Sequence, residues 1–136
     1  MEYPEKTIRM PRAHLDTWLK ALRSGEYKQG SDVMHDPDTS TYCCLGVLQR
    51  AVSGRIETDG DELPTMEWLE RHNISFFGVS GDLEQNPYLP EHCTTAAELN
   101  DSMDYTSYGE YAHNYSFEYI ANAIEKAAEA IEDTTP

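Results

Sequence analysis

The first regular feature of the chain is a helical repeat of apolar residues near its start. Four apolar residues recur at spacings of three and four, which is the repeat of one helix face: Leu15, Trp18, Leu19 and Leu22. Pro11 suits a first helical turn, where its missing amide proton is not needed, and Gly25 suits a helix stop. The pattern predicts a helix over residues 11–24, preceded by a flexible arm over residues 1–10.

Two segments with strand-forming residues follow, on either side of an Asp-Pro-Asp turn at residues 36–38. They span residues 26–34 and 41–43, and the second contains Tyr42, an aromatic residue that favours strands. The two segments are predicted to form a hairpin, and Gly30 marks a candidate bulge within it.

The next segment, residues 44–54, is apolar on nearly all sides, which indicates a short, buried central helix that ends at Gly54. Gly46 lies inside it and costs about 1 kcal/mol of helix stability relative to alanine. We therefore expect another stretch of backbone to pass close to Gly46.

Shorter elements are predicted in the second half of the chain. Residues 56–58 favour a short strand, residues 63–73 a helix around Trp68, and residues 74–79 another strand. Residues 81–92 resemble a loop.

Two helix caps mark the last elements. Thr95 suits the cap of a brief helix through Leu99, and Ser116 suits the cap of a final helix whose apolar stripe continues to Ile131. The order of elements predicts one α+β domain over residues 11–136. A small antiparallel sheet, made of the hairpin and one or two short strands, is expected to pack with about four helices around the buried central helix.

Charge is unevenly distributed along the chain, whose formal net charge is −15. Residues 1–56 carry eight Lys/Arg and seven Asp/Glu, a balance of +1, whereas residues 57–136 carry two and eighteen, a balance of −16. Such a field repels nucleic acids and anionic membranes, so neither is an expected partner. The carboxylates favour solubility, and the alternative is an acidic surface that mimics DNA phosphates.

The cysteines and the apolar stretches bear on the compartment. Cys43, Cys44 and Cys93 are odd in number and include an adjacent pair, which is not the pattern of a disulfide framework and indicates reduced thiols. Apolar stretches are too short to cross a membrane, and the first residues lack the apolar core of a secretory signal. A cytoplasmic protein is expected.

Chemistry-bearing patterns are few. A cysteine at a helix N-terminus has a lowered pKa, which makes Cys43 or Cys44 a candidate nucleophile, but free cysteines are also among the most buried residues. Five histidines offer possible bases: His14, His35, His72, His92 and His113. Nothing in the sequence places a thiol beside a histidine, and neither zinc-ligand spacing nor a phosphate-binding loop occurs. We therefore predict no catalytic residue, metal site or cofactor.

Tyrosines recur three or four residues apart near the end of the chain, at Tyr105, Tyr108, Tyr111, Tyr115 and Tyr119. They would form one aromatic stripe if the final helix extended backwards, although Gly109 and Ser116 argue against an unbroken helix. The stripe is either packed against the domain or exposed as a protein-binding face, because interfaces favour tyrosine.

A small group of polar and aromatic residues after the first helix is the main candidate for ligand binding. Arg23, Tyr27, Lys28 and Gln29 combine two cations, a ring and an amide, and Tyr42 adds a second ring for stacking. Such a group suits an anionic or nucleotide-like ligand. The alternative is a well-built helix-to-strand connection.

Several blocks of the sequence resemble small proteins of tailed phages and prophages, in the same order. These blocks are Trp18 to Gly30, Tyr42-Cys43-Cys44-Leu45-Gly46-Val47-Leu48, Leu63-Pro64 with Trp68, Leu99-Asn100-Asp101, and Ser116 to Ala121. The Tyr-Cys-Cys-Leu-Gly-Val-Leu string is the most specific. The link between Asp101 and Ser116 is longer than in that group.

The resemblance implies a phage accessory protein that acts in the cytoplasm of an infected bacterial host. Accessory proteins of this kind often block or sequester host factors, so we expect a non-catalytic binder of a nucleotide-type defence signal or of a host protein. Asn100 and Asp101 join the five candidate contacts named above. The alternatives are an acidic DNA mimic that inhibits a host nucleic-acid-binding protein, and a small cysteine-dependent enzyme.

Overall fold

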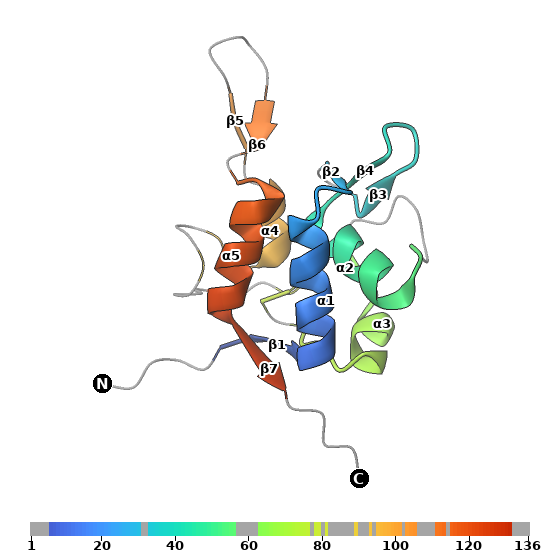
Figure 1. The fold of residues 1–136 in the computed structure, drawn as a ribbon, viewed down its shortest axis with the longest axis vertical. Coiled ribbons are helices and arrows are strands. Elements are labelled where there is room, and N and C mark those ends of the chain that lie inside the picture. Colours follow the sequence, from blue (N-terminus) through green and yellow to red (C-terminus); the bar gives the residue numbers. More distant parts are fainter. Residues whose placement is uncertain are drawn as a thin grey trace, which may run out of the picture.

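The α+β class is confirmed by the computed structural model (Figure 1). The structure describes residues 6–30, 33–56, 63–76, 78, 79, 81, 89, 93, 95–101, 103–105, 111–113 and 115–131. Its helices are α1 (Arg12–Arg23), α2 (Cys44–Ser53), α3 (Met66–Arg71), α4 (Ala96–Asp101) and α5 (Phe117–Ala127). Its strands are β1 (Ile8–Pro11), β2 (Lys28–Gln29), β3 (His35–Asp36), β4 (Thr41–Tyr42), β5 (Met103–Tyr105), β6 (Tyr111–His113) and β7 (Ala128–Ile131).

Helix α1 forms where the apolar repeat predicts it and lies between α2 and α5 (Figure 1). Its four repeating apolar residues are all buried, so the predicted face is the one that contacts the core. The indole nitrogen of Trp18 donates a hydrogen bond of 2.9 Å to the carbonyl of Cys44, which joins α1 to the start of α2. Burial of the ring and this bond fix the position of the central helix.

Helix α2 is the buried central helix that the sequence predicts, and it ends at Gly54 with a positive φ of 79°. The expected close approach of backbone at Gly46 is present, because a Cβ atom there would overlap the carbonyl oxygen of Met34. The Met34 carbonyl also accepts a hydrogen bond of 3.1 Å from the amide of Cys43. The absence of a side chain at Gly46 thus lets the segment before β3 pass over the first turn of α2.

The predicted hairpin is present in part. Strands β3 and β4 pair antiparallel around residues 37–40, with His35 opposite Tyr42. The earlier segment was predicted as one arm of this hairpin, but its strand β2 lies on the other side of β4 and pairs with it in parallel. The sheet β2–β4–β3 is therefore mixed, with one parallel and one antiparallel pair of strands.

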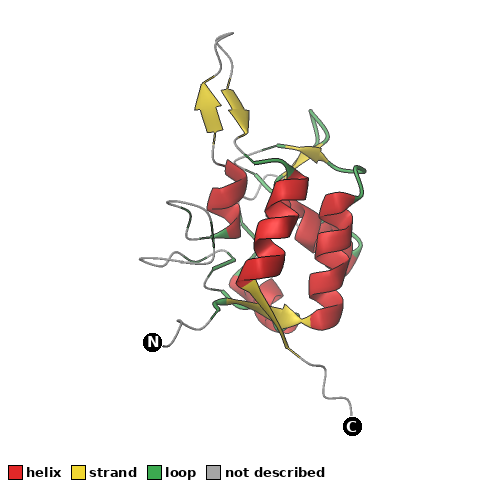
Figure 2. Cartoon of the chain, turned by 60° about the vertical axis from the view of Figure 1, so that its left-hand side comes forward, coloured by secondary structure: helices red, strands yellow, loops and turns green. Residues whose placement is uncertain are grey.

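The two ends of the described chain meet in a parallel pair of strands, β1 and β7, with Ile8 opposite Ala128 and Pro11 opposite Ile131 (Figure 2). The flexible arm predicted over residues 1–10 is therefore wrong for residues 8–10, and Ile8 and Met10 are fully buried. The final helix was predicted to reach Ile131 but ends at Ala127. Pairing with β1 overrides the local helical pattern, as tertiary contacts often do.

The strand predicted over residues 74–79 is also wrong. None of its described residues lies in a strand: Phe76 is in a bend, Gly78 and Val79 are in a turn, and Gly78 has a φ of 83°. Ser75 nevertheless lies beside β1, because its amide donates a hydrogen bond of 2.8 Å to the carbonyl of Arg9 and its hydroxyl accepts one of 2.9 Å from the Arg9 amide. The segment caps the edge of β1 without becoming a strand.

The predicted caps of two helices are confirmed. The hydroxyl of Thr95 accepts a hydrogen bond of 3.0 Å from the Glu98 amide at the start of α4, and the hydroxyl of Ser116 accepts one of 3.2 Å from the Tyr119 amide at the start of α5. Helix α3 begins at Met66, later than predicted, with Thr65 as its cap. The short strand predicted over 56–58 and the loop predicted over 81–92 fall largely outside the described residues.

The tyrosine-rich segment does not extend α5 backwards. Strands β5 and β6 pair antiparallel instead, with Tyr105 opposite Tyr111, and the two-stranded hairpin projects from the helical body (Figures 1 and 2). Tyr115 and Tyr119 stack with ring centroids 4.8 Å apart at the first turn of α5. The proposed single stripe is therefore divided between a hairpin and a helix.

Candidate ligand-binding site

The structure separates the seven candidate contact residues into three places. Gln29, Asn100 and Asp101 lie where α4 meets the start of α2. Tyr27, Lys28 and Tyr42 lie on or beside the sheet β2–β4–β3, and Arg23 lies in a groove between α1 and α5. Only the first two groups contain candidates that contact one another.

The first group forms what we call the polar junction, made of Gln29, Gly30, Cys44 and Asn100. The fully buried Asn100 side chain makes four hydrogen bonds. Its oxygen accepts bonds from the Gln29 amide (3.1 Å) and the Cys44 backbone amide (3.2 Å). Its nitrogen donates to the Gly30 carbonyl (2.9 Å) and to a carboxylate oxygen of Asp101 (2.9 Å).

The partners of Asn100 are themselves tied to the fold. The Gln29 amide also donates a bond of 3.0 Å to the Tyr115 carbonyl before α5, and the Cys44 thiol donates one of 3.2 Å to the Ala96 carbonyl of α4. Three segments far apart in the sequence thus meet through one amide side chain. Because buried polar groups are usually hydrogen-bonded, these contacts give the side chains of Gln29 and Asn100 a structural role.

The adjacent thiols lie at the N-terminus of α2, where Cys44 belongs to the junction and Cys43 precedes it. Burial raises the pKa of Cys43 from its ordinary 9.0 to about 11, although the backbone amides of Gly46 and Leu45 lower it. Burial also raises the pKa of Cys44 well above 9.0, and the charge of Cys43 adds to the effect. Burial raises the pKa of Cys93 as well.

The effect expected for a cysteine at a helix N-terminus is therefore present but smaller than the cost of burial. At neutral pH these thiols are protonated and inaccessible, which gives a cysteine-dependent mechanism no support. Within the described part of the chain, no group of three or more metal-ligating side chains is close enough to hold an ion.

The second group forms what we call the aromatic surface, made of Tyr27, Lys28, His35 and Tyr42. The ring of His35 stacks on Tyr42 with centroids 4.5 Å apart and planes inclined by 26°, and Tyr27 meets Tyr42 edge-on at 5.1 Å. All three rings are half-buried, and Lys28 is exposed. The surface therefore offers three partly accessible aromatic residues, and the exposed Lys28 lies next to Tyr27 in the chain, opposite Thr41 in the sheet.

His35 was not among the candidate contacts, although its position beside Tyr42 could have been predicted from the sequence. A hairpin closed by the turn at residues 37–40 puts His35 and Tyr42 in the same register position, as the structure shows. Cross-strand neighbours in such a position bring their side chains together on one face.

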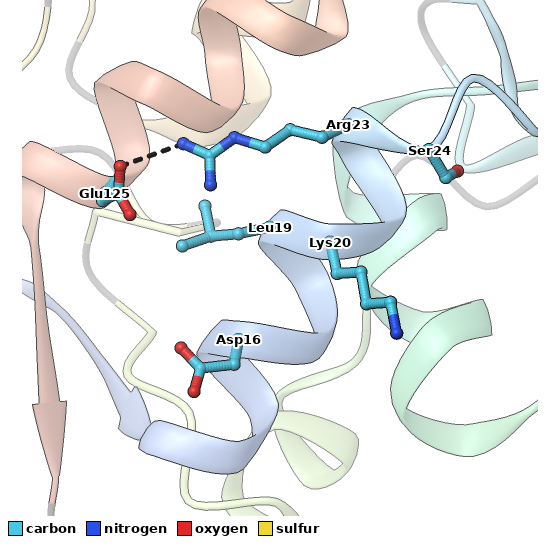
Figure 3. A pocket seen from close by; sticks show the side chains of 6 residues that line it. All are labelled: Asp16, Leu19, Lys20, Arg23, Ser24 and Glu125. Atoms are coloured by element: carbon cyan, nitrogen blue, oxygen red, sulfur yellow. Dashed lines mark hydrogen bonds and ion pairs between the residues drawn. The ribbon is translucent and has the colours of Figure 1, made fainter.

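Arg23 is directed away from both groups. Its guanidinium donates to the side-chain oxygen of Asn122 (2.9 Å) and forms an ion pair of 3.0 Å with Glu125, both on α5 (Figure 3). The open groove at this place has a volume of about 490 Å³ and is lined by Asp16, Leu19, Lys20, Arg23, Ser24 and Glu125. Two cations and two carboxylates are among its lining residues, so the groove has no net charge with which to select an anion.

Comparison with known proteins adds one finding. Residues 10–59 match the model of a family described as a domain of unknown function (DUF8296). The matched span includes the whole aromatic surface and all of the polar junction except Asn100. Comparisons with curated proteins and with solved structures gave no match. Among the described residues, none of the helices has the length and apolar character needed to cross a membrane.

Proposed function

We propose that this protein is a non-catalytic binder that sequesters or blocks a factor of a bacterial host, and that the aromatic surface is its contact site. One observation carries the proposal: the rings of Tyr27 and His35 both contact the ring of Tyr42, and all three residues remain partly accessible on a short sheet that also carries an exposed lysine. In contrast, the thiols are buried, and the side-chain amides of Gln29 and Asn100 form hydrogen bonds within the protein. The accessible chemistry therefore suits recognition better than reaction.

The ligand that fits this surface is a planar ring that carries negative charge, as a nucleotide-type signal does. Stacking of a base on an aromatic side chain contributes about 1–3 kcal/mol and tolerates different bases. The ammonium group of Lys28 supplies a mobile point charge for a phosphate. Tyr27, Lys28 and Tyr42 are thus the contacts we retain from the sequence, with His35 added.

The biological setting of the proposal comes from the resemblance to tailed-phage accessory proteins. A small protein produced during infection acts in the host cytoplasm, where a binder of a defence signal works by lowering its free concentration. Binding without turnover requires only that the protein be abundant relative to the signal.

The test is retention of a ligand from host nucleotides. The purified protein is incubated with a nucleotide extract of infected bacteria, dialysed and denatured, and the released compounds are identified by mass spectrometry. We expect a nucleotide to be released from the native protein in a fixed molar ratio, and expect Tyr42→Ala to retain much less.

One control variant makes the result specific. Met66→Ala removes an exposed apolar side chain on α3, far along the chain from the aromatic surface, and is expected to retain as much nucleotide as the native protein. Release of no nucleotide from the native protein would overturn the ligand assignment, and so would equal retention by Tyr42→Ala.

A further inference from the structure

Two histidines, His14 and His72, lie in ring contact although they are far apart in the sequence. His14 is on α1 and His72 is the C-cap residue of α3, and both residues are half-buried. Their ring centroids are 5.5 Å apart, and the ring planes are inclined by 72°. The pair belongs neither to the polar junction nor to the aromatic surface, so it takes no part in the function proposed above.

We propose that this pair binds a divalent transition-metal ion, which joins α1 to the end of α3. Imidazole nitrogen is a preferred ligand of zinc, copper and nickel, whereas calcium and magnesium prefer oxygen. An ion held at about 2.0–2.1 Å by one nitrogen of each ring places the two ring centres about 5 Å apart. The observed separation is close to this value, and inclined rings can each direct one nitrogen to a shared point.

The end of α3 holds His72 in place. The backbone amide of His72 donates hydrogen bonds of 3.2 Å to the carbonyls of Trp68 and Leu69. Its ring contacts the buried indole of Trp68 with centroids 4.6 Å apart, and the indole nitrogen donates a bond of 2.8 Å to the hydroxyl of Ser53. A side chain that is already ordered loses less conformational entropy when it binds an ion, which favours affinity.

The charge of the protein also favours a cation, because its formal net charge is −15. Two imidazoles are fewer ligands than the four of a structural zinc site, so water completes the coordination and the affinity is modest. We expect a dissociation constant for Cu²⁺ on the order of 10 µM, with weaker binding of Zn²⁺ and no binding of Mg²⁺ by the pair. The three cysteines are buried and do not compete for the ion in the folded protein.

Quenching of tryptophan fluorescence by Cu²⁺ tests the proposal, because the indole of Trp68 contacts His72. Titration of the full chain near neutral pH is expected to give a saturable fall in fluorescence at one ion per chain. His14→Gln and His72→Gln are each expected to raise the dissociation constant about tenfold, and the double variant to abolish saturable quenching. Isothermal titration with Zn²⁺ and with Mg²⁺ gives a second measurement that does not depend on the tryptophans.

Glu118→Gln is the control, because it removes one exposed carboxylate from α5 and leaves both histidines in place. It is expected to leave the dissociation constant within a factor of about two, whereas a tenfold rise would assign the ion to the acidic surface and overturn the proposal. No saturable quenching of the native protein up to about 200 µM Cu²⁺ would also overturn it, and so would native affinity in either single histidine variant. The melting temperature of each variant without metal shows that it is folded.

Discussion

The polar junction and the aromatic surface meet along the short strands β2 and β4, yet the junction centres on the buried Asn100 and Cys44, whereas the aromatic residues are half-buried. On β2, Lys28 is exposed, whereas the next residue, Gln29, turns inward to Asn100. At the end of β4, Tyr42 is half-buried, whereas the next two residues, Cys43 and Cys44, are buried. Successive residues of a strand point to opposite faces, so adjacency in the sequence says little about shared function. The comparison predicts that substitutions in the junction change stability, and that substitutions on the surface change binding.

The largest effect is expected at Asn100. Asn100→Leu keeps a side chain of similar volume but leaves the Cys44 amide and the Gly30 carbonyl without this partner, and removes one of the two acceptors of the Gln29 amide. Each buried polar group left unpaired costs about 1–3 kcal/mol, so we expect the free energy of unfolding to fall by about 3–5 kcal/mol. Urea unfolding followed by circular dichroism measures it.

Glu98→Gln on the exposed face of the same helix serves as the control and is expected to change stability by less than about 0.5 kcal/mol. A loss below about 1 kcal/mol for Asn100→Leu would mean that the junction is not a structural element, because one unpaired group alone costs that much.

The next largest effect is expected from the thiols at the start of α2, as a dependence of folding stability on pH. A folded-state pKa of about 11 for Cys43, against 9.0 in the unfolded chain, means that the folded protein keeps a proton that the unfolded chain loses. This stabilisation is fully present below pH 9 and is lost as the pH rises to 11. Its size is about 2–3 kcal/mol for Cys43.

Thermal melts of the native protein and of a Cys43→Ala, Cys44→Ala double variant test this effect between pH 8 and pH 11. The variant is expected to start less stable and to lose less stability over that interval, since tyrosines and lysines titrate in both proteins. Equal losses would show that the thiols are not buried as described.

A smaller loss is expected for Gly46→Ala. Helix propensity favours alanine by about 1 kcal/mol, but the added methyl group would overlap the Met34 carbonyl, and overpacking of this kind costs about 1–3 kcal/mol or more. We expect net destabilisation by about 1–2 kcal/mol in urea unfolding. Gly54→Ala is the comparison variant. Gly54 has a left-handed backbone conformation and open space around it, so alanine there introduces backbone strain without steric overlap. A Gly46→Ala variant more stable than the native protein would contradict the close approach.

The sequence predicts best where structure is local. The apolar repeat of α1, the buried character of α2 and the caps at Thr95 and Ser116 depend on residues a few positions apart, and these predictions are confirmed. Pairings between distant segments were missed. The sequence around Ile8 contains no signal that it meets Ala128, and the apolar stripe of the final helix continues through residues that the structure places in β7.

For the candidate site, too, the sequence indicated which nearby residues lie together but not which distant residues they contact. A cation, an amide and rings close together in the sequence indicated one cluster, and Tyr27, Lys28 and Tyr42 do lie on or beside one small sheet. Arg23 is not part of this cluster, because its side chain bonds to Asn122 and Glu125 on α5. These two residues lie about a hundred positions further along the chain. Asn100 was predicted as a ligand contact, yet its four hydrogen bonds are internal, and only the tertiary structure reveals that its polar atoms are already paired.

The smallest effect on stability, and the sharpest test of the comparison, is expected at Lys28. Lys28→Gln removes an exposed charge from β2 and leaves the three rings in place, so the free energy of unfolding should change by less than about 0.5 kcal/mol. If the aromatic surface holds a phosphate-bearing ligand, affinity should fall about tenfold, as the loss of a charge-assisted contact predicts. Isothermal titration with the nucleotide recovered from the native protein measures both affinity and stoichiometry. Lys20→Gln, an equal change of charge on α1 in the groove, should leave affinity unchanged. A fall in affinity for Lys20→Gln with none for Lys28→Gln would move the binding site from the sheet to the groove between α1 and α5.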